Sequence, residues 1–350
     1  MKNVSIIASF VGAIFLTSCN NNDDNMDTVN VDYPAAYIVN GEDATLSVIK
    51  LSDNSVSATI NLMGASSTDT IMYPHHISVR SNNLAIGVPG MDFSMGHSGI
   101  STTGMTGKML IVNATNGATI KSLDLPLMNH NTIYSPDGTE IWVPQMDMPG
   151  NVSVYDATTY ELKNTIAVGM MPAELTFSAD GTKAYVANGD GDNVSVINVS
   201  AKTVDATIAV GDNPVGAWTG SDGRMYVDNE DGQSISVINV ATNAIDQTIS
   251  LGFMPGIAAH NGIKKELWVS DPMAGKVHYW TWDAVMNMWM PGAEFVTGAG
   301  AHAIAFTSDG AIAYITNQSA NTVSVVDVLT HMVSKTINVG GKPNGIVIKY

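Results

Sequence analysis

Three features of the sequence predict an all-β fold, the seven-bladed β-propeller. A unit of about 42 residues recurs, and residues 170–211 match residues 212–252 along their whole length. Each unit contains four short runs rich in Val, Ile, Tyr and Thr, separated by turn residues such as Asp-Gly and Asn-Gly, which predicts four antiparallel strands. No segment has a convincing helical period. A repeat of this length with four strands is typical of a propeller blade.

The blades can be assigned in order along the chain. Residues 36–62 supply only the second, third and fourth strands of a unit, and residues 343–350 supply a lone first strand. Pairing these two segments in one sheet would close the ring and remove its sheet edges. Residues 66–127 form a longer unit because they contain an extended loop. The other five units begin near Met128, Met170, Asp212, Phe253 and Gly300.

Two stretches carry a family resemblance. AYVANGDGDNVSVINV at residues 184–199 and AYITNQSANTVSVVDV at residues 313–328 resemble the YVTN-type β-propeller repeat family. The resemblance covers nearly the whole mature chain and implies the propeller fold. It implies little about activity, because propellers carry many unrelated functions.

The first 32 residues are predicted to lie outside the propeller. A positive start and a short apolar stretch indicate a secretory signal peptide at residues 1–18, too short to span a membrane as a mature helix. The sequence before Cys19, the only cysteine, resembles a bacterial lipobox, which implies lipidation of that residue. Residues 19–32 then form a lipid-anchored flexible tether, and residues 33–350 form the propeller. Asn20, in place of the retention Asp, favours the outer membrane within the bacterial cell envelope.

The charge balance restricts the partners. Lys and Arg number 15 against 32 Asp and Glu, a formal net charge of −17. This excess of negative charge repels nucleic acids and anionic lipid surfaces and concentrates cations near the protein. We expect no nucleic-acid partner, and membrane contact only through the lipid anchor.

Alignment of the innermost strands places histidines around the central channel. Matching positions hold His75 with His76, His130 with Asn131, Glu174, and His302. In the plain repeat family this position is small, often Gly. Imidazole groups recurring there have little packing role, so the sequence predicts a site for a metal ion or a small ligand at the channel mouth.

The loop GMDFSMGHSGISTTGM at residues 90–105 lies on the same predicted face of the propeller, as do several other methionine-bearing loops. Thioether sulfur and imidazole together form a soft ligand set that suits Cu(I). Methionine is also an adaptable filler of apolar gaps, so each of these side chains could instead plug the channel mouth or contact a partner. The loop residues added to the predicted copper site are His97, Met91, Met95, Met128, Met146, Met148 and Met171.

Three functions remain open. The first is a non-catalytic copper-binding lipoprotein, since the His-His pair resembles the propeller domain of nitrous oxide reductase, which holds copper with more histidines than this face offers. The second is a metal-dependent lactonase or lyase. The third is a scaffold for a protein or glycan partner, with a tryptophan patch in the sixth blade. The residues concerned are His130, Asn131, Glu174 and His302 for the enzyme, and Trp280, Trp282 and Trp289 for the scaffold.

Overall fold

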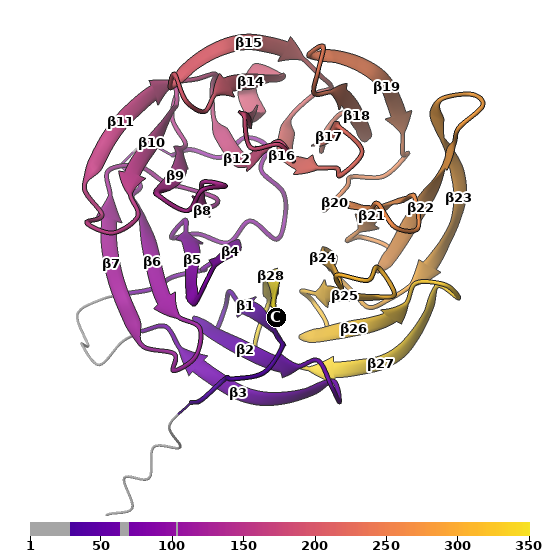
Figure 1. Cartoon of the computed structure of the whole chain (residues 1–350), viewed down its shortest axis with the longest axis horizontal. Helices are drawn as coiled ribbons and strands as arrows, with labels where there is room; N and C mark the ends of the chain where they lie inside the picture. Colours follow the sequence, from indigo (N-terminus) through magenta and orange to yellow (C-terminus); the bar gives the residue numbers. More distant parts are fainter. Residues whose placement is uncertain (1–28, 64–69, 103) are drawn as a thin grey trace, which may run out of the picture.

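The computed structural model describes residues 29–63, 70–102 and 104–350 as a ring of seven four-stranded antiparallel sheets around a central axis (Figure 1). The predicted seven-bladed β-propeller is confirmed. Beyond the strands, the described residues include one short 3₁₀ turn, Gly189–Gly191, and no helix long and apolar enough to cross a membrane. The predicted signal peptide and Cys19 lie outside the described residues.

The first sheet closes the ring. Its order is β28-β1-β2-β3, so the last strand of the chain is the innermost strand of the first blade, as predicted. Ala36 pairs with Ile348 and Ile38 with Ile346 across the junction. The backbone groups of β1 are then hydrogen-bonded to β28 on one side and to β2 on the other, so β1 is not an edge strand. The strands are β1 (Ala35–Asn40), β2 (Thr45–Lys50), β3 (Ser55–Asn61) and β28 (Pro343–Lys349).

The next three blades follow in chain order. In the second and third blades the innermost strands, β4 and β8, are short. The strands are β4 (Ile77–Arg80), β5 (Asn83–Val88), β6 (Gly107–Asn113) and β7 (Thr119–Leu125); β8 (Ile133–Tyr134), β9 (Glu140–Gln145), β10 (Asn151–Asp156) and β11 (Leu162–Ala167); β12 (Pro172–Phe177), β13 (Lys183–Asn188), β14 (Asn193–Asn198) and β15 (Thr203–Ala209).

The last three blades repeat the same meander, with long outer strands in the sixth. The strands are β16 (Pro214–Thr219), β17 (Arg224–Asn229), β18 (Ser234–Asn239) and β19 (Ala244–Ser250); β20 (Ala258–Asn261), β21 (Glu266–Asp271), β22 (Lys276–Asp283) and β23 (Met288–Val296); β24 (Ala301–Phe306), β25 (Ile312–Asn317), β26 (Thr322–Asp327) and β27 (Met332–Asn338).

The hydrophobic core is divided among the blade interfaces. Seven apolar clusters each join two neighbouring sheets, from the first and second sheets round to the seventh and first. Trp142 and Trp268, in second strands, are fully buried there. Trp280 and Trp289 are also buried, at the interface of the fifth and sixth blades, so the exposed patch predicted from them is wrong. Trp282 is half-buried against the same cluster, with its ring centroid 5.3 Å from that of Trp289.

Packing begins before the predicted boundary at residue 33. Val31 is buried between the first two blades, and its backbone N–H donates to the carbonyl of Thr115 at 2.8 Å. The last part of the segment predicted as a tether therefore belongs to the folded body.

Candidate functional site

The candidate site lies at one mouth of the channel, where the innermost strands begin. His75 and His76 come directly before β4, His130 comes shortly before β8, and His302 lies in β24. Two glycines let the backbones approach closely. A Cβ on Gly345 would lie 2.6 Å from the carbonyl oxygen of His75, and a Cβ on Gly87 would lie 2.6 Å from that of His130. Glycine at these positions thus allows each blade to press against the histidine-bearing strand of the next.

The four histidines form one cluster, which the structure assembles from three blades. The ring centroid of His75 lies 4.5 Å from that of His76, 4.3 Å from that of His130 and 5.7 Å from that of His302. The structure therefore gathers the channel-facing imidazoles that the repeat alignment placed at matching positions. Their role as metal ligands stays a prediction.

Three of these imidazoles can offer nitrogen atoms to a common point. One nitrogen atom from each of His75, His76 and His302 lies within 4.8 Å of the others. The Nδ1 atom of His75 and the Nε2 atom of His302 are enclosed and have no hydrogen-bond partner among the residues that the structure describes. Leaving a buried polar atom unpaired costs about 1–3 kcal/mol, so such atoms call for a partner such as a water molecule, a ligand or an ion.

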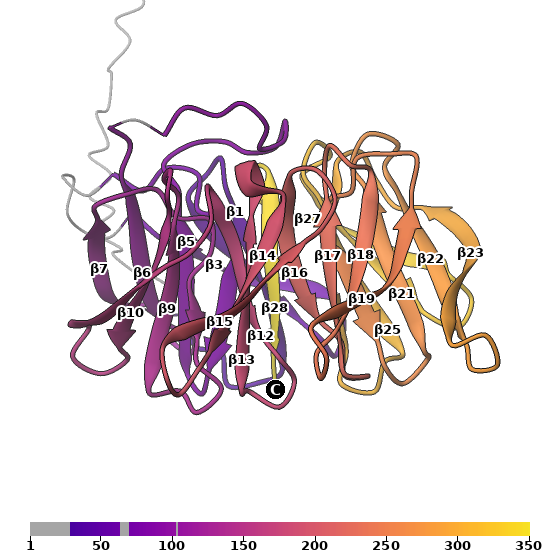
Figure 2. The same ribbon diagram turned by 90° about the horizontal axis from the view of Figure 1, so that it is seen from above.

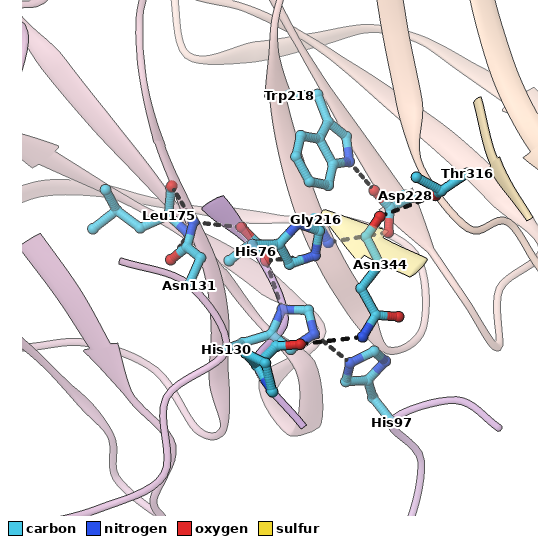
Figure 3. A network of polar contacts seen from close by, with 12 residues as sticks. His76, His97, His130, Asn131, Leu175, Gly216, Trp218, Asp228, Thr316 and Asn344 are labelled. Carbon is cyan, nitrogen blue, oxygen red and sulfur yellow. Dashed lines mark hydrogen bonds and ion pairs between the residues drawn. The ribbon is translucent and has the colours of Figure 1, made fainter. Parts of the chain in front are cut away.

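A buried glutamate, Glu174, contacts three residues of the network in Figure 3: His76, His130 and Asn131. Glu174 Oε1 lies 2.6 Å from Nδ1 of His130 and 3.1 Å from Nε2 of His76, and Glu174 Oε2 accepts a hydrogen bond from the Asn131 amide. Asn131 also donates to the carbonyl of Leu175 at 2.8 Å, which fixes its orientation. A second potential metal group, His76, His130 and Glu174, has its atoms already engaged in these bonds. The three-histidine group is therefore the better metal site.

The loop between β5 and β6 runs along this rim (Figure 2), and its His97 contacts the cluster. His97 Nε2 lies 2.9 Å from Nε2 of His130, and His97 Nδ1 lies 2.9 Å from Oε1 of Glu230. The backbone N–H of His97 donates to the other oxygen of Glu230 at 3.0 Å. An ion pair between Asp92 and Lys342 holds the loop on the first blade. These contacts fix His97 over the channel.

Burial controls protonation in the cluster. Desolvation lowers the pKa of His76 and of His302 to about 3 and holds the pKa of His75 and His130 well below the usual value, because neighbouring imidazoles also disfavour a positive charge. Desolvation raises the pKa of Glu174 to about 7. At neutral pH the histidines are therefore neutral, which is the form that binds metals.

The pKa of Glu230 shifts in the opposite direction to that of Glu174. Burial raises its pKa, but the electrostatic interaction with His97 and two hydrogen bonds from that residue outweigh burial and bring the pKa of Glu230 below its usual value. When Glu174 is protonated, its carboxyl group can donate a hydrogen bond to Nδ1 of His130. Nε2 of His130 can then donate to Nε2 of His97, and Nδ1 of His97 can donate to the Glu230 carboxylate. With Nε2 of His76 donating to Glu174, the other ring nitrogen of His76 keeps its lone pair. A continuous hydrogen-bonded chain then links the buried glutamate to the rim.

Sequence reasoning missed Asp228 and Glu230. Both are buried; Asp228 accepts hydrogen bonds from the backbone of Gly216, at 3.0 Å, and from the Trp218 indole, and burial raises its pKa to about 7. A signal was present in the repeats, since VANGDG in the fourth blade becomes VDNEDG in the fifth. The two carboxylates thus replace the small residues of the preceding unit, and the inner ring holds more acidic groups than the innermost strands alone suggested.

The structure divides the predicted methionines into a buried group and an exposed group. Met128, Met146 and Met171 are buried against Phe93 in an apolar cluster under the loop, with Met91 packed at its side. Met148 and Met95 are exposed to 52% and 88%. The buried group packs against apolar side chains of the loop, including Phe93 and Ile100, which accounts for its position by packing alone.

The fold defines this protein as a seven-bladed β-propeller, and its similarities to known proteins are consistent with that class. No protein-family model matches the chain. The uncharacterised protein YncE of Salmonella typhi is 32% identical over 91 residues, which is 26% of this chain and 25% of that protein. The matched stretch therefore spans about a quarter of that relative's length.

Several solved structures share the fold at low sequence identity. The periplasmic gluconolactonase of Pseudomonas aeruginosa is 14% identical, with a TM-score of 0.69 over 91% of this chain and 99% of that chain. A putative 6-phosphogluconolactonase from Bacteroides fragilis is 13% identical, with a TM-score of 0.68 over the same shares. Hydrazine synthase of Kuenenia stuttgartiensis is 16% identical, with a TM-score of 0.66 and again 91% and 99% coverage. These similarities establish the propeller fold and nothing further.

Proposed function

We propose that this protein binds a copper ion at the axial cluster, through His75, His76 and His302. The observation that carries the proposal is the pair of enclosed imidazole nitrogens, on His75 and His302, that lack partners within the described ranges while sharing a site with His76. Imidazole nitrogen suits copper and zinc, and among divalent first-row ions copper binds such sites most tightly.

The residues around the three histidines and the net charge of the chain also support copper binding. Glu174 lies within hydrogen-bond distance of two imidazoles of the cluster, His76 and His130, and a carboxyl group in this position orients metal-binding histidines. The low pKa of His76 and of His302, each about 3, keeps both rings neutral and available to a metal at neutral pH. A net charge of −17 also raises the local concentration of cations.

The proposal also covers where the protein is located in the cell. The lipobox-like sequence ending at Cys19 and the following Asn20 support a lipoprotein held at the outer membrane of a bacterial envelope. There a histidine site serves better than thiolates, because exported proteins face oxidising conditions.

Metal-induced stabilisation tests the proposal. The purified chain, freed of metal with a chelator, is melted with and without Cu(I) under anaerobic conditions, and in parallel with Zn(II). At free copper about 100 times the dissociation constant, binding should add about 2.7 kcal/mol to the free energy of unfolding and raise Tm. The double variant His75→Gln, His302→Gln should lose this response.

A matched control is His331→Asn, which removes an imidazole on the opposite rim and should keep the response. Equilibrium dialysis measures copper directly if the double variant folds poorly. The proposal is wrong if the wild-type chain binds less than one copper ion, or if copper in the double variant keeps the nitrogen coordination that X-ray absorption finds in the wild type. Stronger stabilisation by zinc would instead assign the site to zinc.

A second candidate function is a metal-dependent lactonase. It is favoured by Glu174, a buried carboxyl hydrogen-bonded to His130 whose pKa near 7 suits general acid–base chemistry at neutral pH. Two structures with the same fold also bear lactonase names. Hydrolysis of a sugar lactone by the metal-loaded chain, abolished in Glu174→Gln and retained in His331→Asn, would support this candidate. No turnover above the metal-only rate would exclude it.

A further inference from the structure

A second, more open site adjoins the histidine cluster on the same rim. A cavity of about 240 Å³ lies between the loop that carries His97, the loop that enters the sixth blade and the loop between β21 and β22. Its lining includes His97, His302 and Glu230, together with three methionines from three different loops: Met95, Met254 and Met273.

Two of these methionines have largely exposed side chains. Met95 is 88% exposed and Met273 is 85% exposed, although both border a cavity that could have covered them. Burying a methionine side chain would be favourable by about 1.5–3 kcal/mol, so packing does not explain these positions. They differ in this respect from Met128, Met146 and Met171, which are buried against Phe93.

A thioether and a carboxylate meet at the inner side of the cavity. Gly96 shows their closeness: a Cβ there would lie 3.6 Å from the Met254 sulfur and 3.5 Å from Oε2 of Glu230. Glu230 is held as a carboxylate by His97, with an Oε1–Nδ1 distance of 2.9 Å. The cavity therefore combines sulfur ligands with a buried negative charge that favours a cation.

His302 belongs to both the cavity and the histidine cluster. It lines the cavity, and it is one of the three histidines with nitrogen atoms within 4.8 Å of one another. A Cβ on Gly256, at the cavity wall, would lie 3.2 Å from Nδ1 of His302, so glycine at this position leaves the ring close to the cavity. An ion in the cavity would thus have a short path to the axial cluster.

We propose that this cavity is a capture site for Cu(I), in which Met95, Met254 and Met273 bind the incoming ion and transfer it to the axial histidines through His302. The inference rests on the proposed copper function and adds the oxidation state and the route. Thioethers bind Cu(I) without releasing a proton, and they do not suit Zn(II), which prefers imidazole, thiolate or carboxylate. Copper stays Cu(I) throughout, and the transfer only exchanges sulfur ligands for nitrogen ligands.

The rate of copper loading tests the inference. The metal-free full chain is mixed with Cu(I) supplied from a coloured chelator complex, and the decay of the chelator absorbance is followed by stopped flow. The triple variant Met95→Leu, Met254→Leu, Met273→Leu keeps apolar bulk and should fold normally. We expect it to load copper about tenfold or more slowly, within the range over which association rates vary among variants of one site, and to reach the same final stoichiometry.

Matched controls are Met148→Leu, on the same rim outside the cavity, and Met332→Leu, on the opposite rim; Met148 is 52% exposed and Met332 is 66% exposed. Both should load copper at the wild-type rate, and Zn(II) loading should be the same in all variants. An unchanged rate in the triple variant would overturn the capture site while leaving copper binding intact. Equal slowing in the Met148 or Met332 control would overturn it as well.

A second measurement does not depend on rates. In the double variant His75→Gln, His302→Gln the final site is disabled, so Cu(I) added in less than equimolar amount should stay at the methionines. X-ray absorption at the copper edge should then show sulfur ligands. Only nitrogen and oxygen ligands there would contradict the capture site, whereas absence of copper from the wild-type chain would overturn the underlying copper function.

Discussion

Histidines occur on both rims of the propeller, in opposite surroundings. On the rim away from the candidate site, His331 stacks on Tyr279 with ring centroids 4.0 Å apart, and its Nε2 lies 3.1 Å from a carboxylate oxygen of Glu266. His260, on the same rim, accepts a hydrogen bond from the backbone of Ser221 at 3.2 Å. These imidazoles have partners that account for their presence.

At the channel mouth the neighbours of a histidine are mainly other histidines. His75 lies against three imidazoles and Phe93, and its Nδ1 has no partner among the described residues. The difference teaches that residue type alone does not identify a binding site. A polar side chain that is buried without its partners indicates a ligand, while the same side chain with partners stabilises the fold.

The pH dependence of stability should separate the two kinds of histidine most strongly. Between pH 4.5 and 6.5 the unfolded chain carries protons on His75, His76, His130 and His302, whereas burial keeps these rings neutral in the folded chain. Glu174 and Asp228, whose folded pKa values are about 7, hold protons in the folded chain only. In this window the unfolded chain holds four protons on the histidines, and the folded chain holds two on the carboxyl groups. The unfolded state thus binds more protons, and the free energy of unfolding rises with pH.

Each net proton corresponds to about 1.4 kcal/mol per pH unit. Above pH 6.5 the histidine contribution ends, and once Glu174 and Asp228 ionise in the folded chain near pH 7 the two states bind equal numbers of these protons, so stability should level off near pH 7. Urea unfolding of the chelator-treated protein at several pH values measures the slope. The double variant His75→Gln, His302→Gln should flatten the rise below pH 6.5; an unaltered slope would show that these rings titrate normally.

Replacing a partnered histidine should have a smaller, destabilising effect. His331→Asn removes the stacked contact with Tyr279 and the interaction with Glu266, while Asn tolerates the positive φ of 54° at this position. We expect a loss of about 1 kcal/mol in the free energy of unfolding. Denaturant midpoints measure it, and stability equal to that of the wild type would mean that the stacked pair contributes nothing.

Replacing an unpartnered histidine should have the smallest effect on the metal-free chain. His75→Leu exchanges a buried imidazole with an unpaired Nδ1 for an apolar side chain, so the cost of burying that nitrogen disappears. Stability should stay within about 1 kcal/mol of wild type or increase, while the copper response is lost. A large loss of stability would show that His75 is a structural residue like His331.

Much of the architecture could be predicted from the sequence. The repeat with its turn residues gave the number of strands and blades, and the incomplete first unit with the lone final strand gave the ring closure. The alignment of inner strands also brought His75, His130 and His302 to one place. These predictions hold because blades repeat, so that position within a unit determines position around the axis.

Other parts of the site could not be predicted in this way. His97 contacts Glu230, which is 133 residues further along the chain, because an irregular loop crosses the channel. Met128, Met146 and Met171 lie on the same rim but turn into a cluster with Phe93. Loop paths and side-chain directions outside the strands depend on packing against several blades at once, and no local pattern records them.

The sequence by itself determined the all-β ring, its closure and the ring of inner-strand histidines, because turn chemistry and alternating apolar residues act over a few residues. Only the tertiary structure decided which polar atoms are left unpaired, which carboxylates stand behind the imidazoles and which methionines remain exposed. Desolvation is the physical reason: burial lowers the pKa of His302 and raises that of Glu174, and it depends on atoms contributed by distant blades.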